Sequence, residues 1–299
     1  MEQIQNNRVI TDLYRENAQF PGIALDGSDV YLCWQRFVDR HDSLMASCRR
    51  GDEVVWEREI SDGGEVLHPV ILAHGGAIWY AWSEYARENW RILARCYRDG
   101  RWGEVLTVAS GEALFFPRLF TWQGRLHVIW TEQHKGSAAA VLCPLTEAGP
   151  GAAETVSVVG EAYRAGAAEG GDGNLYVAYD GFDGKQYKLF ARARTAAGWS
   201  EEIVVSQGED WASTPWIAAK PDGAVVGWYD YGYMAVYSVR SADLTVRDGA
   251  LAAVNPQCLK EGVDWYLDLH VASNSSGLQA MAYTRSKYDV LVCLSLIHI

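Results

Sequence analysis

The sequence has no cysteine pair at the spacing of a metal site and no long apolar run. Its six cysteines lie far apart and none forms a CxxC pair, so we expect no zinc or other metal site. No apolar stretch approaches the ~18 residues of a membrane-spanning helix. The first ten residues, MEQIQNNRVI, lack the basic and apolar segments of a signal peptide. We therefore expect a cytoplasmic protein without a membrane span.

Positive charge is also scarce. The chain has 38 acidic and 26 basic residues and a net charge of −12 at pH 7, which argues against nucleic acid or an anionic membrane as the main partner. Phenylalanine is scarce too, at seven residues, whereas 13 tryptophans and 16 tyrosines favour strands. No segment is a convincing Walker, dinucleotide-binding or Ser-His-Asp motif, so we predict no cofactor.

The sequence does contain an internal repeat of about 48 residues. An aromatic residue ends an apolar run in each of six repeats, at Trp34, Trp82, Trp130, Tyr179, Trp228 and Tyr283. A second marker lies 13 residues upstream, at Pro21, Pro69, Pro117, Gly166, Pro215 and His270. A third marker, in three repeats, is the tryptophan that opens another strand, at Trp56, Trp102 and Trp199.

Each repeat holds four short extended runs. In the second repeat they read HPVILA, AIWYAW, RILARCY and WGEVLTV, with glycine-containing turns between the first and second and between the third and fourth. Four strands in about 48 residues are typical of a β-propeller blade. We therefore predict an all-β fold, a β-propeller of six four-stranded blades, in one domain over residues 1–293.

The two ends of the chain carry further expectations. The segment NNRVIT at 6–11 resembles the ends of the fourth strands, whereas the last repeat ends in a third strand, YDVLVC. We predict that the N-terminal strand completes the last blade and leaves no unpaired edge there. The last six residues, LSLIHI, match the translation of a sequencing-library adapter, so we predict that residues 294–299 are a non-native tail on a C-terminally truncated chain. The alternative is a genuine apolar strand end.

Three cysteines fall at nearly the same place in successive third strands. These are Cys48, Cys96 and Cys143. Equivalent positions in neighbouring blades lie too far apart for a disulfide, so we predict small buried side chains and a reducing compartment.

The candidate binding site follows from how blades are connected. The connections from second to third strand and from each blade to the next emerge on one face, where ligands usually bind. The candidates there are Arg36, His68, Glu84, Tyr85, Glu132, Arg164, Asp180, Trp211, Asp230 and Tyr231. Aromatic faces beside polar groups suit sugars, and carboxylates also suit Ca²⁺. The alternative is structural: solvated loop acids, and aromatic side chains that seal neighbouring blades.

The repeat resembles those of the degenerate bacterial relatives of sialidase-type (BNR-repeat) propellers, over residues 7 to 293. The shared pattern is P-x-I/L-A … G-x-hydrophobic-small-Trp … R … G-x-W. The family's Asp-box, S-x-D-x-G-x-T-W, is partly kept in YRDGRW, with Asp99, Gly100 and Trp102. The resemblance implies an Arg-Ile-Pro motif, three arginines that grip a carboxylate, a Tyr–Glu pair and an acidic Asp. The first repeat reads AQFPG, without an arginine, so the resemblance implies the fold rather than the activity.

Three functional hypotheses remain open. The first is a binding module that recognises a glycan or another small molecule. The second is a protein-interaction propeller within a larger protein, and the third is a glycoside hydrolase in which paired acids such as Glu84 and Glu132 act. Whether the chain is an enzyme is left undecided by the sequence.

Overall fold

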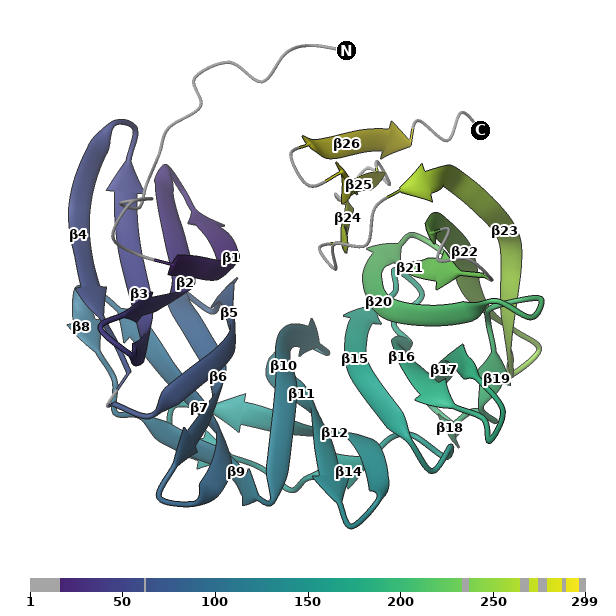
Figure 1. The fold of residues 1–299 in the computed structure, drawn as a ribbon, viewed down its shortest axis with the longest axis horizontal. Coiled ribbons are helices and arrows are strands. Elements are labelled where there is room, and N and C mark those ends of the chain that lie inside the picture. Colours follow the sequence, from purple (N-terminus) through teal and green to yellow (C-terminus); the bar gives the residue numbers. More distant parts are fainter. Residues whose placement is uncertain are drawn as a thin grey trace. The chain divides into compact units, whose positions relative to one another are not determined.

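The computed structural model describes residues 17–61, 63–232, 237–263, 269–273, 279–286 and 289–295. Within these ranges the regular elements are all β-strands, as predicted (Figure 1), and no helix has the length and apolar character needed to cross a membrane. The segment 6–11, predicted to complete the last blade, and residues 296–299 of the predicted tail lie outside the described residues. The chain divides into two compact units, residues 1–111 and 112–299.

Two antiparallel sheets make up the described part of the first unit. One has the strand order β1-β2-β3-β4, and the other has the order β5-β6-β7-β8 with β9 paired to β7. The strands are β1 (Asn17–Asp26), β2 (Asp29–Val38), β3 (His41–Arg50), β4 (Glu53–Glu59), β5 (Glu65–His74), β6 (Ala77–Ala86), β7 (Asn89–Arg98), β8 (Arg101–Trp102) and β9 (Leu106–Gly111).

The described part of the second unit forms four antiparallel sheets. Their orders are β10-β11-β12-β13 with β14 on β12, β15-β16-β17-β18 with β19 on β17, β20-β21-β22-β23, and β24-β25-β26. The strands are β10 (Ala113–Trp122), β11 (Arg125–His134), β12 (Ser137–Thr146), β13 (Gly149–Pro150), β14 (Glu154–Thr155), β15 (Ala162–Glu169), β16 (Leu175–Phe182), β17 (Tyr187–Thr195), β18 (Gly198–Trp199), β19 (Ile203–Val204), β20 (Trp211–Lys220), β21 (Gly223–Tyr231), β22 (Tyr237–Arg247), β23 (Ala250–Val263), β24 (Leu269–Ser273), β25 (Gln279–Ser286) and β26 (Asp289–Ser295).

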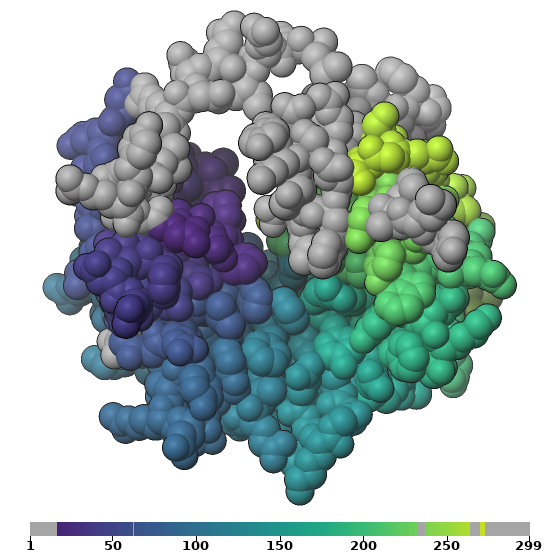
Figure 2. Space-filling view, viewed as in Figure 1, coloured from purple at the N-terminus to yellow at the C-terminus, as the bar shows by residue number. Residues whose placement is uncertain are grey.

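Within each unit, neighbouring sheets pack with their first strands in contact. β1 contacts β5 in the first unit, and β10, β15, β20 and β24 follow one another in the second. The core clusters lie between neighbouring sheets, one around Tyr80 and Trp82 and another around Tyr176 and Trp228. In the second unit, side chains close the gaps between the ribbons of neighbouring sheets (Figure 2). Each four-stranded sheet therefore resembles a propeller blade, whereas the number of blades stays a prediction.

An irregularity recurs in the first strand of five sheets. The register against the second strand slips at the same repeat position in β1, β5, β10, β15 and β20. The first residue of each slip has a positive φ, at Phe20, His68, Phe116, Arg164 and Thr214. In four of the five sheets a proline marker of the repeat comes next. A β-bulge of this kind bends the strand and re-aims the side chain at its centre.

In the fourth repeat, the sequence analysis assigned the proline-marker position to Gly166, which is one residue too late. Gly166 pairs with Ala178 at the place where Val70 pairs with Ala81. Ala165, rather than Gly166, therefore holds the proline position. The extra residue lies in the turn at 170–174 between β15 and β16, which is longer than the corresponding two-residue turn between β5 and β6.

The turns between first and second strands and between third and fourth strands agree with prediction, whereas those between second and third strands do not. The tight turns at 75–76 and 99–100 are confirmed, with positive φ at both residues of each. The connections from second to third strand, predicted as loops, are equally tight in three sheets, at 39–40, 87–88 and 135–136. Candidate residues predicted in these loops consequently lie inside strands.

The cysteines behave as predicted. Cys48, Cys96 and Cys143 are buried, as is Cys33, whereas Cys258 is exposed. They contribute small apolar surface to the packing between sheets.

An arginine of the third strand forms hydrogen bonds both within its own sheet and to the preceding sheet. Arg192 Nε donates to Ser200 O at 3.0 Å, and its Nη1 donates to Val156 O of the preceding sheet at 2.7 Å. Its guanidinium carbon also lies 5.3 Å from the ring centroid of Trp199. In the first unit Arg95 makes the same set of contacts, with Gly103, Ile60 and Trp102. This arrangement explains the R … G-x-W part of the repeat.

Replacing this arginine tests its structural role. Arg192→Met should lower the free energy of unfolding by about 2–4 kcal/mol, because hydrogen bonds from a charged donor to two carbonyls are lost. Chemical denaturation followed by tryptophan fluorescence measures the change. Arg125→Met, at an exposed site of the same unit, is the control and should change stability by less than about 0.5 kcal/mol. Equal losses in both variants would contradict the assignment.

Candidate functional site

A row of aromatic side chains crosses the neighbouring ends of two sheets in the second unit. Phe182 at the end of β16 contacts Tyr187 at the start of β17, with ring centroids 5.5 Å apart. Tyr187 contacts Trp211 at the start of β20 at 5.4 Å. Trp211 contacts Tyr231 of β21 at 5.4 Å, and Tyr231 contacts Tyr237 of β22 at 5.3 Å. These five residues are the aromatic row.

Strand register builds the aromatic row. Phe182 lies opposite Tyr187, and Tyr231 lies opposite both Trp211 and Tyr237 on its two neighbouring strands. Aromatic pairs directly opposite one another across strands stabilise a sheet by ~0.2–1 kcal/mol each. Trp211 remains 38% exposed, so its ring offers an apolar surface to solvent.

Arg164 and Asp180 form an ion pair beside the aromatic row. Arg164 Nε donates to Asp180 Oδ1 at 3.1 Å, and its Nη2 bonds the second carboxylate oxygen. Asp180 is fully buried. The backbone N–H of Arg164, at the centre of its bulge, donates to Thr131 Oγ1 of the preceding sheet at 3.0 Å. Asp180 lies on β16 two residues before Phe182, so the ion pair lies beside the row. Burial raises the pKa of Tyr231, while the nearby charge of Arg164 lowers it.

Asp230 lies next to Tyr231 on β21 and is buried. Its Oδ1 accepts a hydrogen bond from Trp228 Nε1 at 2.6 Å, and its Oδ2 lies 2.5 Å from Arg240 Nε. Burial raises the pKa of Asp230 above its ordinary value, although the Trp228 hydrogen bond and the charge of Arg240 act in the opposite direction. Lys188, also buried, lowers the pKa of Asp230 by its charge and donates to the carbonyl of Gly208.

The structure adds a residue that the sequence analysis missed. Arg118 of β10 lies with its guanidinium carbon 3.5 Å from the ring centroid of Trp216. Burial lowers the pKa of Arg118 to about 9, against the opposing charge of Asp180, so the guanidinium stays charged at pH 7. The sequence did contain a sign that Arg118 is unusual, because an arginine follows the Pro117 marker directly where the second repeat has Val70.

Four candidates belong to the first unit. Arg36 donates to Ser43 Oγ and Glu59 Oε2, both at 3.3 Å, on the surface of its own sheet. His68 occupies the bulge of β5 and contacts the ring of Phe20 edge-on, with ring centroids 5.0 Å apart. The other two, Glu84 and Tyr85, line a pocket of that unit.

The acid two residues after the marker tryptophan is a structural residue in two sheets. Trp82 Nε1 donates to Glu84 Oε2 at 3.4 Å, as Trp228 does to Asp230. The expectation of solvated acids is therefore wrong for Glu84, which is 1% exposed. The expectation of a solvated acid holds for Glu132, which is exposed on β11. In this sheet the buried Trp130 Nε1 has no hydrogen-bond partner among the described residues.

The structure thus brings Arg164, Asp180, Trp211, Asp230 and Tyr231 together in the second unit. Glu132 belongs to the same unit, in the middle strand of another sheet, opposite Leu114 and Ala139. Within the described ranges, no group of three or more His, Cys, Asp or Glu side chains is placed to hold a metal ion.

No protein-family model and no curated protein matches this sequence, but solved structures match the fold. NanB sialidase from Streptococcus pneumoniae has a TM-score of 0.62 at 7% identity, over 95% of this chain and 69% of its own. The subtype N10 neuraminidase-like protein of A/little yellow-shouldered bat/Guatemala has a TM-score of 0.57 at 7% identity, over 91% and 92%. A puromycin-hydrolyzing peptidase from Mycobacterium tuberculosis has a TM-score of 0.54 at 16% identity over 90% of this chain, which spans 42% of that peptidase.

These similarities concern the fold alone. The chain has an all-β, propeller-type fold of the kind found in sialidases. Proteins of different chemistry share it, since one of the three is a peptidase.

The raised pKa of Asp230 predicts a pH dependence of stability. Folding favours the protonated carboxyl, so the stabilisation is complete below the ordinary pKa of about 3.9 and is lost as the pH rises through the raised value. We therefore compare the unfolding free energy of the wild type with that of Asp230→Asn. The difference, wild type minus variant, should decrease as the pH is raised from about 3.5 to about 7. Denaturation at both pH values measures this difference, and an increase with pH would contradict a raised pKa for Asp230.

Proposed function

We propose that the protein binds glycans, with the aromatic row of the second unit as the surface on which a sugar ring stacks. The observation that carries this proposal is the half-exposed ring of Trp211, held between Tyr187 and Tyr231. An aromatic ring held in place by neighbouring rings presents a large apolar face with little loss of conformational freedom on binding.

Polar groups beside the row supply the means to read sugar hydroxyls. The guanidinium of Arg164 is fixed by Asp180, and side chains fixed in this way provide oriented donors and acceptors at a binding site. The phenols of Tyr187, Tyr231 and Tyr237 add hydroxyl groups along the row. The similarity in fold to a sialidase and to a neuraminidase-like protein is compatible with a glycan ligand.

Binding is favoured over hydrolysis because the buried carboxylates are already engaged. Asp180 is paired with Arg164, and Asp230 is paired with Trp228 and Arg240. A glycosidase needs one carboxyl free to donate a proton and a second free to attack or to activate water.

A glycoside hydrolase is the second candidate, favoured by the direction of the pKa of Asp230 and by a Tyr–Glu pair near the row. The raised pKa of Asp230 is a property of general acids in active sites. A Tyr–Glu pair also lies near the row, since Tyr163 contacts Tyr187 at 6.1 Å and its hydroxyl donates to Glu161 Oε2 at 3.4 Å.

Replacing the central ring of the row tests glycan binding. Trp211→Ala should weaken the binding of any glycan found on an array by at least about tenfold, or ~1.4 kcal/mol, and Trp211→Phe should retain part of the affinity. Isothermal titration calorimetry measures both. Val204→Ala, at a 53% exposed apolar residue of the same unit, is the control. Unchanged affinity in a folded Trp211→Ala variant would remove the aromatic row from the binding site.

The two candidate functions separate in a turnover assay. The binding proposal predicts no cleavage of bound oligosaccharides by the wild type over a day, as followed by mass spectrometry. Release of shorter products that stops in the Asp230→Asn variant would instead establish the hydrolase.

A further inference from the structure

We propose that the pocket of the first unit is a second saccharide site, equivalent in repeat position to the site at the aromatic row. Its ligand class is a neutral saccharide with several free hydroxyl groups. The inference rests on the proposed function in that both sites take a carbohydrate, but it concerns a separate cavity built from other residues.

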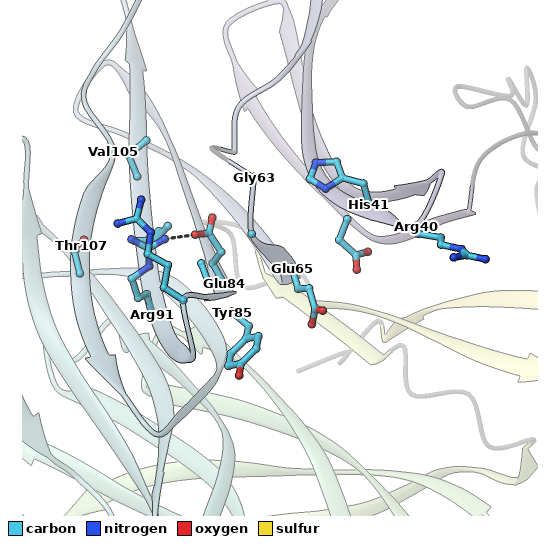
Figure 3. Close-up of a pocket in the computed structure, with 14 residues that line it drawn as sticks. Arg40, His41, Gly63, Glu65, Glu84, Tyr85, Arg91, Val105 and Thr107 are labelled. Carbon is cyan, nitrogen blue, oxygen red and sulfur yellow. Dashed lines mark hydrogen bonds and ion pairs between the residues drawn. The ribbon is translucent and has the colours of Figure 1, made fainter.

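The pocket has a volume of about 590 Å³, within the ~300–1,000 Å³ typical of small-molecule sites. One wall comes from the turn at 39–40 and the start of β3. The other comes from the ends and starts of β5, β6, β7 and β9 (Figure 3). The residues involved lie in the first unit, so the pocket is complete within that unit.

The aromatic component of the pocket repeats one part of the aromatic row, whereas Glu65 lies opposite Tyr85 where the row has Trp211 opposite Tyr231. Tyr85 at the end of β6 lies opposite Trp90 at the start of β7, with ring centroids 5.2 Å apart. Phe182 with Tyr187 and Tyr231 with Tyr237 occupy the same position in their own sheets. Each pair joins the end of a second strand to the start of a third. The Tyr85 ring therefore occupies, in the first unit, the repeat position that Phe182 and Tyr231 occupy in the second.

A buried acid paired with an arginine recurs as well, although Arg91 lies directly opposite Glu84 and Arg240 lies opposite Trp228. Glu84 precedes Tyr85, accepts from the indole of Trp82 and pairs with Arg91 of the neighbouring strand. In the second unit Asp230 precedes Tyr231, accepts from Trp228 and pairs with Arg240. Figure 3 shows Glu84 and Arg91 directed toward each other on adjacent strands, close to Tyr85. Two binding sites built from one repeat pattern follow from the duplication of the blade.

A glycine provides the space that this ion pair needs. A Cβ at Gly64 would lie 2.4 Å from Glu84 Cγ, so only glycine lets the chain pass this close to the carboxylate. The Gly64 backbone covers one side of Glu84. Arg91, whose side chain is 36% exposed, stays accessible at the pocket wall.

The charges lining the pocket indicate a neutral ligand. The acids Glu84 and Asp42 are engaged, the first by Arg91 and the second by Gln35 Nε2 at 2.8 Å. The remaining charged side chains at the pocket are of both signs, at Arg40, Arg87 and Glu65. An anion or a cation would therefore meet groups of its own sign, whereas hydroxyl groups find both donors and acceptors. Val105 adds apolar surface against which the C–H groups of a sugar pack.

Binding stoichiometry tests the inference. Wild-type protein is titrated calorimetrically with cellotriose, xylotriose, mannotriose and arabinotriose, and with 3′-sialyllactose as the anionic comparison. We expect two sites per chain for at least one neutral trisaccharide. Tyr85→Ala and Trp211→Ala should each leave one site, and the double variant should leave none. Val54→Ala, at a 47% exposed residue of the first unit, is the control and should keep both.

A second variant separates loss of the pocket from loss of folding. Thr107 is exposed and lines the pocket, so Thr107→Trp fills the cavity without altering the Glu84–Arg91 pair. It should remove the same site as Tyr85→Ala, with an unchanged thermal unfolding midpoint.

Each outcome has a distinct meaning. One site in the wild type, lost in Trp211→Ala and kept in Tyr85→Ala and Thr107→Trp, overturns the second site and leaves the proposed function standing. Binding of 3′-sialyllactose alone at the pocket overturns the neutral ligand class. No binding of any saccharide by the wild type overturns both the inference and the proposed function.

Discussion

The packing of each central strand between two neighbouring sheets is the constraint on which the rest of the structure depends. The second strands are buried on both faces, as in β6, where eight consecutive residues are buried. Burial of this kind stabilises by roughly 25 cal/mol for each Å² of apolar surface removed from water. It also means that any polar atom on these strands needs a partner inside the protein.

The site residues follow from that constraint. The tryptophans that fill the space between sheets carry an indole N–H, and in two sheets a carboxylate two residues further along the same strand face accepts it. The buried carboxylate in turn needs a positive charge, which Arg91 and Arg240 supply. A structural requirement of the core thus places an oriented ion pair near the end of each of these strands, next to an aromatic pair. The proposed recognition of carbohydrate uses the same groups.

The sequence was sufficient for the strands and for their repeat, because the markers reflect packing that every blade shares. It also placed Arg164, Asp180, Trp211, Asp230 and Tyr231 in one set of ten candidates, and the structure brings these five together because equivalent strand ends of adjacent sheets lie together. It failed where single residues decide the local geometry. Two-residue turns formed without glycine at 39–40 and 87–88 turned predicted loops into strands.

Other parts of the site were beyond the sequence analysis for physical reasons. Tyr187 and Tyr237 lie at the starts of third strands, where only the cross-strand register shows that they meet Phe182 and Tyr231. The burial of Glu84 and Asp230 depends on the pairing of each strand with the next, because a strand-end acid has the same sequence whether it is solvated or enclosed. Glu132 illustrates this, since it shares their repeat position and is exposed.

The proposed function requires that aromatic pairs at the strand ends recognise carbohydrate. The most direct measurement is a crystal structure of the wild-type protein soaked with the neutral oligosaccharide that binds it best. We expect a pyranose or furanose ring that lies parallel to the indole of Trp211, with its hydroxyl groups hydrogen-bonded to neighbouring side chains. A sugar bound with the Trp211 ring left in solvent would contradict it.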